Sequence, residues 1–265
     1  MTFIKMNSVE FQNNDIYFME ILEEMIVIND NYHGLFVLNS RLKKICEIEL
    51  FEGLTIYSSF NYKSKLLLFC PENNCLVYVD LNLMQKKIIP LSGFENWIFS
   101  PLYIWNQNDV VLSDYKGNVV RVDLENCRIH IPDKQDVMYR SIKADNEKWK
   151  GYQIHKIYRE KKKAILIEQN QILKLVDYSH DMRIIGEFQK GQFYDFEWEN
   201  DYFTMVSEDK VLLVHDGKSI SLKPEQSYNF FRGKIMSKKK DVLFLLSAMK
   251  SHLNNSKIQK IELAK

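Results

Sequence analysis

The chain lacks any long hydrophobic run. None of its apolar segments approaches the roughly 20 residues that a membrane-spanning helix needs. Its first residues, MTFIKMNSVEFQNND, have no basic stretch followed by an apolar core, so they do not read as a signal peptide. We therefore expect a cytoplasmic protein without a membrane partner.

The chain also has little net charge. Its 36 Lys and Arg residues oppose 35 Asp and Glu residues, which leaves a formal charge of +1. Because binding to a phosphate backbone depends on clustered positive charge, we expect no nucleic-acid partner. Two Lys-rich segments, residues 159–163 and 237–240, stand where short turns are expected. A solubilising role in those turns is preferred over contact with an acidic partner or a phosphate.

Cysteine is scarce, with only Cys46, Cys70, Cys75 and Cys127. Cys70 and Cys75 flank the turn PENN and are the only pair placed for a hairpin disulfide, but reduced thiols are the preferred interpretation for a cytosolic protein. The nucleophile-elbow, phosphate-loop and zinc-protease motifs are all absent. The histidines are too scattered for a local metal site: His33, His130, His155, His180, His215 and His252. We predict no catalytic residue, no metal and no cofactor.

What the chain does contain is a recurring sequence pattern. An apolar strand ends in a polar residue, and a polar turn and a last short strand follow. The polar residues recur at intervals of 41, 43, 54, 39 and 46 residues: Asn39, Asp80, Asp123, Asp177, Asp216 and Glu262. A period of about 40–50 residues built only from short strands is typical of a β-propeller.

The repeat predicts an all-β fold, namely a six-bladed β-propeller of four-stranded antiparallel blades in a single domain, residues 1–265. An N-terminal strand completes the last blade and closes the fold. Five blades with an open edge are the main alternative. The expected blades are residues 12–50, 54–91, 94–131, 151–188, 192–223 and 227–263 with 2–7.

The longest interval contains an insertion, residues 132–150, which is charged and carries Tyr139 and Trp149. Insertions in repeat folds form loops on one face, and that face is often the binding face. A solvated loop with one aromatic residue tucked against a blade is slightly preferred here.

The first strand of each blade is expected to line a central channel and to carry aromatic and charged residues. Aromatic side chains offer a large contact area at low entropic cost. The residues predicted to bind a ligand at the channel mouth are Tyr57, Trp97, Trp105, His155, Tyr194, Asp195, Trp198 and Arg232. About half of the aromatic residues on these strands are equally explained by packing between blades.

One strand carries alternating carboxylates, Asp195, Glu197, Glu199 and Asp201, which alternation places on one face. Such a row can bind Ca²⁺ or serve in acid–base catalysis, but a solvated charged face is the commoner arrangement. An enzyme interpretation would use Asp195, Glu197 and His155.

The segment FSPLYIWNQNDVVLSDYKGNVVRVDLENCRI, residues 99–129, resembles a kelch-like repeat of uncharacterised bacterial six-bladed propellers. The resemblance lies in Pro101, Gly117 followed by Asn118, and the closing VDLEN. The chain departs from true kelch repeats by lacking a double glycine, and from WD40 repeats by lacking their Gly-His and Trp-Asp pairs. The resemblance implies a fold and not an activity.

From these observations we expect a monomeric, non-catalytic scaffold that binds a protein or peptide. One version is a bacterial accessory or immunity-type protein. The alternative is a propeller enzyme, a hydrolase or lyase acting on a sugar or peptide.

Overall fold

The computed structural model describes residues 2–179, 181–237, 241–252 and 254–264. His180 and most of the second Lys-rich segment, residues 238–240, lie outside the described residues. The described chain forms six four-stranded antiparallel sheets. This is the predicted six-bladed β-propeller, and two compact units make it up.

The first unit comprises residues 1–54 and 192–265 and contains three of the sheets. Their strands run in the orders β2-β3-β4-β5, β18-β19-β20-β21 and β22-β23-β24-β1. The strands are β1 (Thr2–Phe11), β2 (Met19–Leu22), β3 (Met25–Asp30), β4 (Gly34–Asn39), β5 (Lys44–Glu49), β18 (Asp195–Glu199), β19 (Tyr202–Val206), β20 (Val211–His215), β21 (Lys218–Leu222), β22 (Tyr228–Ser237), β23 (Asp241–Met249) and β24 (Ser256–Ala264).

The second unit comprises residues 55–191 and contains the other three sheets and a helix. Each sheet follows chain order, as β6-β7-β8-β9, β10-β11-β12-β13 and β14-β15-β16-β17. The elements are β6 (Ser58–Tyr62), β7 (Lys65–Cys70), β8 (Cys75–Asp80), β9 (Gln85–Pro90), β10 (Phe99–Trp105), β11 (Asp109–Asp114), β12 (Val119–Asp123), β13 (Arg128–His130), α1 (Val137–Lys148), β14 (Gln153–Tyr158), β15 (Lys163–Ile167), β16 (Ile172–Asp177) and β17 (Arg183–Gln189).

The repeated polar residue at the end of the third strand shapes the turn that follows it. Asp80 Oδ1 accepts hydrogen bonds from the backbone N–H groups of Asn82 and Leu83, and Asp123 Oδ1 accepts from those of Glu125 and Asn126. Asn39 and Asp177 make equivalent bonds to the turns that follow them. A short carboxylate or amide is needed there because it mimics a backbone acceptor in the turn.

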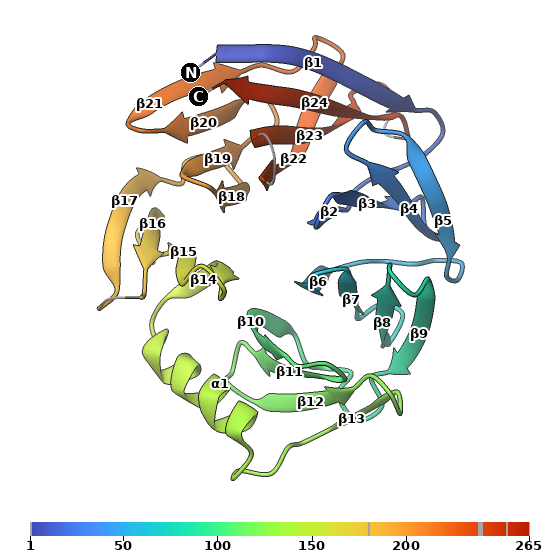
Figure 1. Cartoon of the computed structure of the whole chain (residues 1–265), viewed down its shortest axis with the longest axis vertical. Helices are drawn as coiled ribbons and strands as arrows, with labels where there is room; N and C mark the ends of the chain where they lie inside the picture. The colour runs from blue at the N-terminus through green and yellow to red at the C-terminus, as the bar shows by residue number, and fades with distance from the viewer. Residues whose placement is uncertain (1, 180, 238–240, 253, 265) are drawn as a thin grey trace. The chain divides into compact units, whose positions relative to one another are not determined.

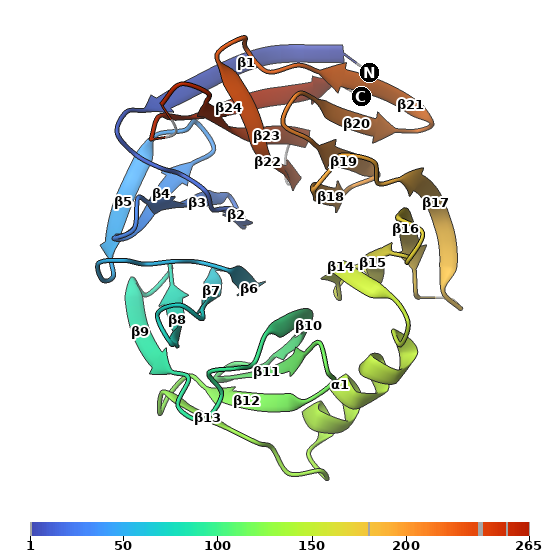
Figure 2. The same cartoon turned by 180° about the vertical axis from the view of Figure 1, so that it is seen from behind.

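The N-terminal strand closes the last sheet, as predicted. β1 pairs antiparallel with β24 from Phe3 opposite Leu263 to Phe11 opposite Ser256. Figures 1 and 2 show β1 lying along the outside of β24. The strand is longer than the predicted 2–7, and its pairing ties the two ends of the chain together through backbone hydrogen bonds.

One buried amide, that of Asn29, makes four of the hydrogen bonds that hold the link from β1 to β2. Its Oδ1 accepts from the N–H groups of Tyr17 and Phe18, and its Nδ2 donates to the carbonyls of Asp15 and Asn31. The Asn29 side chain is fully buried, so water cannot reach it to replace these bonds. This amide replaces the sheet partners that an irregular buried segment lacks.

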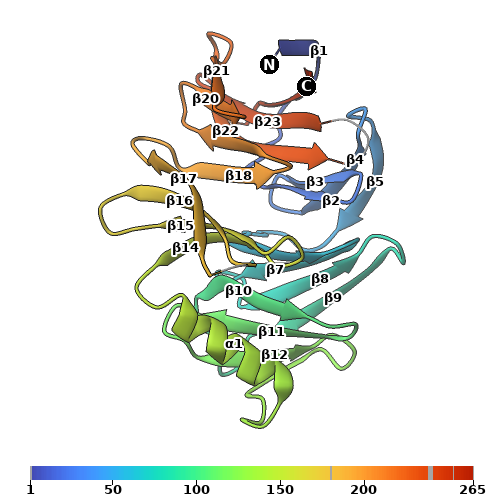
Figure 3. The same cartoon turned by 60° about the vertical axis from the view of Figure 1, so that its left-hand side comes forward.

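The insertion is a helix, where a loop was expected. Asp136 caps its N-terminus by accepting from the N–H groups of Met138 and Tyr139. Ile142 and Trp149 are buried and join the core with Leu102 of the neighbouring β10. In Figure 3 the helix lies alongside β11 and β12. The preferred expectation of an aromatic tucked against a blade therefore holds for Trp149, although the segment around it is not a loop.

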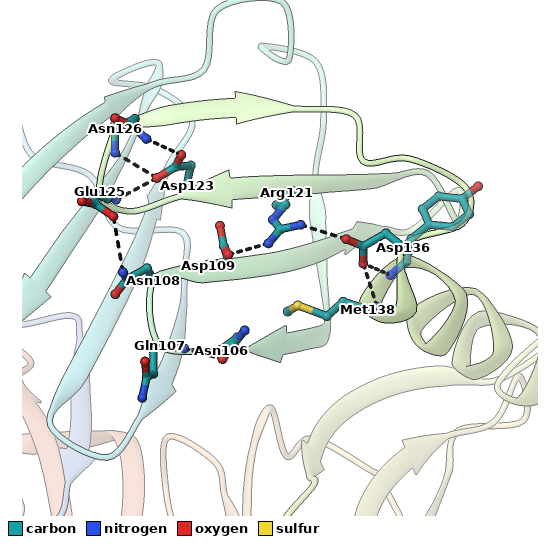
Figure 4. A network of polar contacts seen from close by, with 11 residues as sticks. Asn106, Gln107, Asn108, Asp109, Arg121, Asp123, Glu125, Asn126, Asp136 and Met138 are labelled. Carbon is teal, nitrogen blue, oxygen red and sulfur yellow. Dashed lines mark hydrogen bonds and ion pairs between the residues drawn. The ribbon is translucent and has the colours of Figure 1, made fainter.

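Arg121 on β12 joins the helix to its sheet. Its Nη2 lies 2.5 Å from Asp109 Oδ2, and its Nη1 lies 2.8 Å from Asp136 Oδ2 (Figure 4). The Asp109 hydrogen bond is the largest of the effects that together raise the pKa of Arg121 above its ordinary value. One guanidinium thus holds both a strand carboxylate and the helix cap.

All four cysteines are free thiols. Cys70 and Cys75 are direct partners across the β7–β8 hairpin, as their spacing predicts.

Replacing Asn29 with Ala is expected to lower the free energy of unfolding by about 2–4 kcal/mol, because buried donors and acceptors lose their partners. Urea unfolding followed by circular dichroism measures the effect. The control is Asn170→Ala, which removes an exposed amide. Equal stability of the two variants would show that Asn29 does not fix the link.

Replacing Arg121 with Gln is expected to weaken the attachment of α1 to its sheet. Asp136 would still cap the helix, but it would lose the guanidinium that ties this cap to β12. Limited proteolysis should cut residues 131–151 faster, and stability should fall by roughly 1 kcal/mol. Arg128→Gln, on the exposed side of β13, is the matched control. Unchanged cleavage in Arg121→Gln would contradict this role.

Candidate functional site

The five most exposed tyrosines share one position in their sheets. We call the end of a sheet at which its first strand begins the entry end; the turn between the second and third strands lies at the same end. Three of these tyrosines directly precede a first strand: Tyr57 precedes β6, Tyr152 precedes β14 and Tyr194 precedes β18. The other two, Tyr32 and Tyr115, lie in turns between a second and a third strand. Large, rigid and amphipathic tyrosine rings are typical of protein-binding surfaces.

In the second unit, Tyr57 and Tyr115 are each 60 % exposed, and Ile98 is 50 % exposed. The N–H of Tyr57 donates to Phe69 O at 2.9 Å, and the N–H of Tyr115 donates to Ile98 O at 3.3 Å. These backbone bonds fix both rings at the entry ends of β6–β9 and β10–β13. We name Tyr57, Ile98 and Tyr115 the tyrosine patch.

Trp97 and Trp105, both predicted site residues, lie at opposite ends of β10. Trp97 is half-buried near the tyrosine patch, with its ring 5.3 Å from that of Phe94. Trp105 ends β10 and stacks on Tyr62 at 6.3 Å. A strand of this length separates its ends by roughly 20 Å, so the structure does not bring the two tryptophans together.

His155 occupies a bulge in β14. The pairing passes from Ile154 opposite Leu166 to Lys156 opposite Ile165, which leaves His155 as the extra residue. Bulges re-aim side chains and are frequent beside functional sites. The His155 side chain is half-buried at this position.

In the first unit, three predicted residues meet: Tyr194, Asp195 and Arg232. Asp195 is buried, and its Oδ2 accepts from Gly233 N at 2.9 Å while its Oδ1 lies 3.4 Å from Arg232 Nη1. The Tyr194 hydroxyl donates a short hydrogen bond to the carbonyl of Phe230. Partial burial, followed by nearby carboxylates, raises the pKa of Tyr194 to about 12, so the phenol stays neutral.

Gly233, which donates its N–H to Asp195, packs closely against Val206 of β19. A Cβ at this position would lie 2.9 Å from Val206 Cγ2, so only glycine fits without a shift. Beside it, Phe231 is the extra residue of a bulge between Phe230 and Arg232 and is 40 % exposed. Trp198, by contrast, is buried, so it packs in the interior, whereas a ligand-binding role at the channel mouth was predicted.

Behind Asp195 lies a buried cluster of charges from three first strands. Lys234 Nζ on β22 is 3.3 Å from Glu197 Oε2 on β18 and 3.5 Å from Glu20 Oε1 on β2. The commoner arrangement for the alternating carboxylates, a solvated face, is therefore wrong for Asp195 and Glu197, which are both buried. Burial alone would lower the pKa of Lys234, but the carboxylates of Glu20, Glu197 and Asp195 outweigh it and raise that pKa.

Phe231, Lys234 and Glu20 were not predicted as site residues. Glu20 and Glu197 have one cationic partner in common, Lys234. Lys234 and Glu20 lie on separate strands, so no local sequence motif joins them. The bulge at Phe231 leaves no trace in the sequence SYNFFRGKIM, whose residues do not show which one is extra. A charged residue at a position that alternation assigns to the interior was the only available signal.

Among the described residues, no three or more His, Cys, Asp or Glu side chains are grouped to hold a metal ion. Within the same part of the chain, no helix is long and apolar enough to cross a membrane.

Comparison with known proteins supports the fold. No protein-family model and no curated protein matches the chain, so the kelch-like resemblance is not confirmed. The solved structure of YCF48 bound to D1 peptide matches with a TM-score of 0.59 at 9 % identity, over 100 % of this chain and 97 % of that one.

Two further solved structures show the same fold. The Pan2 WD40 domain of Neurospora crassa gives a TM-score of 0.55 at 7 % identity, over 93 % of this chain and 89 % of its own. Virginiamycin B lyase from Staphylococcus aureus gives 0.51 at 11 % identity, over 98 % and 100 %. At such identities the likeness concerns the fold alone.

Replacing Lys234 with Met is expected to lower the free energy of unfolding by roughly 3–5 kcal/mol, because two buried carboxylates lose their cation. The raised pKa of Lys234 determines how its contribution to the free energy of unfolding depends on pH. That contribution is complete below the ordinary lysine pKa of 10.5 and declines as the pH rises above it. Urea unfolding at about pH 8 and about pH 11 should show the difference between wild type and variant shrinking at the higher pH.

The matched control for this experiment is Lys218→Met on the exposed side of β21. An equal effect of the two substitutions, or a difference that grows with pH, would contradict the ion-pair account.

Proposed function

We propose that the protein is a non-catalytic scaffold that binds a protein or peptide partner at the entry ends of its blades. One observation carries the proposal: the five most exposed tyrosines all lie at these ends. Exposed aromatic residues that carry a polar group are typical of the contact points that dominate binding energy.

The polar residues of the candidate site support the same proposal. Asp195 is held by Gly233 N and Arg232, and Glu197 pairs with Lys234. Carboxylates that are already buried and paired stabilise the sheets, whereas a catalytic acid or base must reach its substrate. Arg232 is the exception, since its side chain is 39 % exposed and its contact with Asp195 is long.

Among proteins of the same fold, one solved structure is that of YCF48 bound to D1 peptide, which agrees with a binding role. The balanced charge of +1 supports a protein partner over nucleic acid. We further propose a monomeric cytoplasmic protein of accessory or immunity type.

A second function is favoured by one observation, the Lys234 cluster. Perturbed titratable groups gather at active sites, and one protein of the same fold is a lyase. In this alternative the chain is a hydrolase or lyase acting on a sugar or peptide, with Asp195 and Glu197 in acid–base roles and His155 as a further candidate. Glu197→Gln would then abolish turnover, whereas a scaffold carrying it would retain its partner.

The proposal is tested by affinity purification of the tagged protein from its own cells. We expect one dominant, stoichiometric partner, with recovery reduced about tenfold by Tyr194→Ala or Tyr57→Ala, because each removes an exposed contact ring. Leu83→Ala is the control, since Leu83 is 64 % exposed in the β8–β9 turn, at the other end of its sheet. Recovery that is unaffected by the tyrosine changes, or that is lost with Leu83→Ala, would contradict the proposal.

A further inference from the structure

The tip of the β7–β8 hairpin places two thiols opposite each other. Cys70 ends β7, Cys75 begins β8, and the two residues are direct partners in the register of the sheet. The turn between them is closed by backbone hydrogen bonds from Asn73 N to Cys70 O at 3.1 Å and from Asn74 N to Pro71 O at 3.0 Å. Register and turn together fix both cysteines within one short element.

This placement fits the dimensions of a disulfide. Directly opposite residues of an antiparallel pair have their Cα atoms about 4.5–5.5 Å apart. A disulfide joins residues whose Cα atoms lie about 4.4–6.8 Å apart, so the bond needs no rearrangement of the strands. The other two cysteines are placed differently, since Cys46 lies opposite Val37 and Cys127 lies in the β12–β13 turn.

The two thiols form a hydrogen bond with each other that makes them chemically different. This bond is the largest effect on both pKa values: it lowers the pKa of Cys75 against the effect of burial, and it raises the pKa of Cys70 together with burial. Cys75 is also slightly more accessible, with 5 % exposure against 0 % for Cys70. The thiol that ionises more readily acts as the nucleophile, and its neutral partner can then close the bond.

The pair lies next to a part of the turn that faces solvent. Glu72 and Asn74, between the two cysteines, are exposed. Because the cysteines themselves are buried, a small uncharged oxidant reaches them more readily than a bulky one. Hydrogen peroxide is an oxidant of this kind.

We propose that Cys70 and Cys75 are a redox pair, which hydrogen peroxide closes to a disulfide across the β7–β8 hairpin and external thiols reopen. The inference goes beyond the proposed scaffold function and does not rest on it. It agrees with the free thiols of the structure, because disulfides in cytosolic proteins are usually transient.

Closure takes two steps. The Cys75 thiolate attacks one oxygen of the peroxide, so that an S–O bond forms, the O–O bond breaks and hydroxide leaves. The Cys70 sulfur then attacks the sulfenic acid on Cys75 and gives up its proton, so that the S–S bond forms, the S–O bond breaks and water leaves. The proton released when Cys75 ionised converts the hydroxide to water, so two thiols and one peroxide become one disulfide and two waters.

Reopening is thiol–disulfide exchange. One external thiolate attacks a sulfur of the disulfide and forms a mixed disulfide, and a second external thiolate displaces the protein sulfur from it. The two external thiols are thereby oxidised to a disulfide, and Cys70 and Cys75 regain their protons.

The hairpin tip also supports the segment that carries Tyr57. Asn73 Oδ1, in the turn, accepts from Thr55 N at 2.8 Å, and Phe69 O on β7 accepts from Tyr57 N at 2.9 Å. A cross-link removes the local opening of the tip that exposes these bonds to water, so oxidation should slow amide exchange in residues 55–57. The redox state of the pair is thus expected to act on one of the entry-end segments.

The test treats the folded full chain with a small excess of hydrogen peroxide, unfolds it and alkylates every remaining thiol. Mass spectrometry then follows the tryptic peptide of residues 66–86, which contains Cys70 and Cys75 but neither of the other cysteines. We expect this peptide to escape alkylation and to weigh about 2 Da less than its dithiol form, because two hydrogens have left. Treatment with dithiothreitol should restore both alkylation sites.

Two variants make the result specific. The double variant Cys46→Ser and Cys127→Ser should form the disulfide like wild type, because neither residue takes part in the pair. Cys75→Ala should leave Cys70 without its partner, so that the peptide of residues 66–86 forms no internal disulfide. The wild-type result and the double variant decide the question even where Cys75→Ala folds poorly.

A second measurement shows whether the fold favours closure, because cysteines so near in sequence also meet in an unfolded chain. The double variant is equilibrated with a fixed ratio of oxidised to reduced dithiothreitol, with and without urea. The disulfide-to-dithiol ratio should be at least about tenfold higher in the folded chain, since the strands already hold the sulfur atoms opposite each other. Amide exchange in residues 55–57 is compared between the oxidised and reduced forms of the same variant.

A peptide of residues 66–86 that keeps both thiols while Cys46 or Cys127 is oxidised would overturn the inference. An equal disulfide-to-dithiol ratio in the folded and unfolded chain, or a lower one in the folded chain, would do the same. Unchanged exchange in residues 55–57 would overturn the predicted action on the entry end. None of these outcomes bears on the scaffold function, which is judged by recovery of a cellular partner.

Discussion

The pairing of β1 with β24 is the interaction on which the rest of the fold depends. Without β1, the sheet β22–β24 would end in a long unpaired edge, which invites pairing with other chains. The backbone bonds from Phe3 to Phe11 remove that edge and hold the N-terminus. The buried amide of Asn29 then fixes the path from β1 into β2, so the first sheet begins where the last one is completed.

The repeat could be read from the sequence because it has a local physical cause. Asn39, Asp80, Asp123 and Asp177 each accept backbone N–H groups in the turn that follows them, and few other side chains do this. The same requirement recurs in successive sheets, which makes the period visible. Closure by the N-terminal strand followed from the count of strands, since the C-terminal segment supplied only three.

The site was harder to predict because its parts come from separate strands. Tyr194, Asp195 and Arg232 were predicted, and the structure joins them. The hydrogen bond from Gly233 to Asp195 and the close packing of Gly233 against Val206 involve strands far apart in the sequence, which no local pattern reveals. The helix α1 was missed because its apolar residues are few, and Arg121 and Trp149 hold it through contacts outside the segment. The exposure of Tyr115 could not be predicted either, because the sequence of a turn does not show which neighbours pack around each of its residues.

Hydrogen–deuterium exchange of the protein with and without its purified cellular partner tests binding at the entry ends most directly. Slower exchange in the presence of the partner is expected in residues 55–57, 91–98, 115–118 and 192–195, because these segments carry the exposed rings. Unchanged exchange is expected in residues 81–84, which form the β8–β9 turn at the other end of the sheet β6–β9. Protection confined to residues 81–84 and similar turns would contradict it.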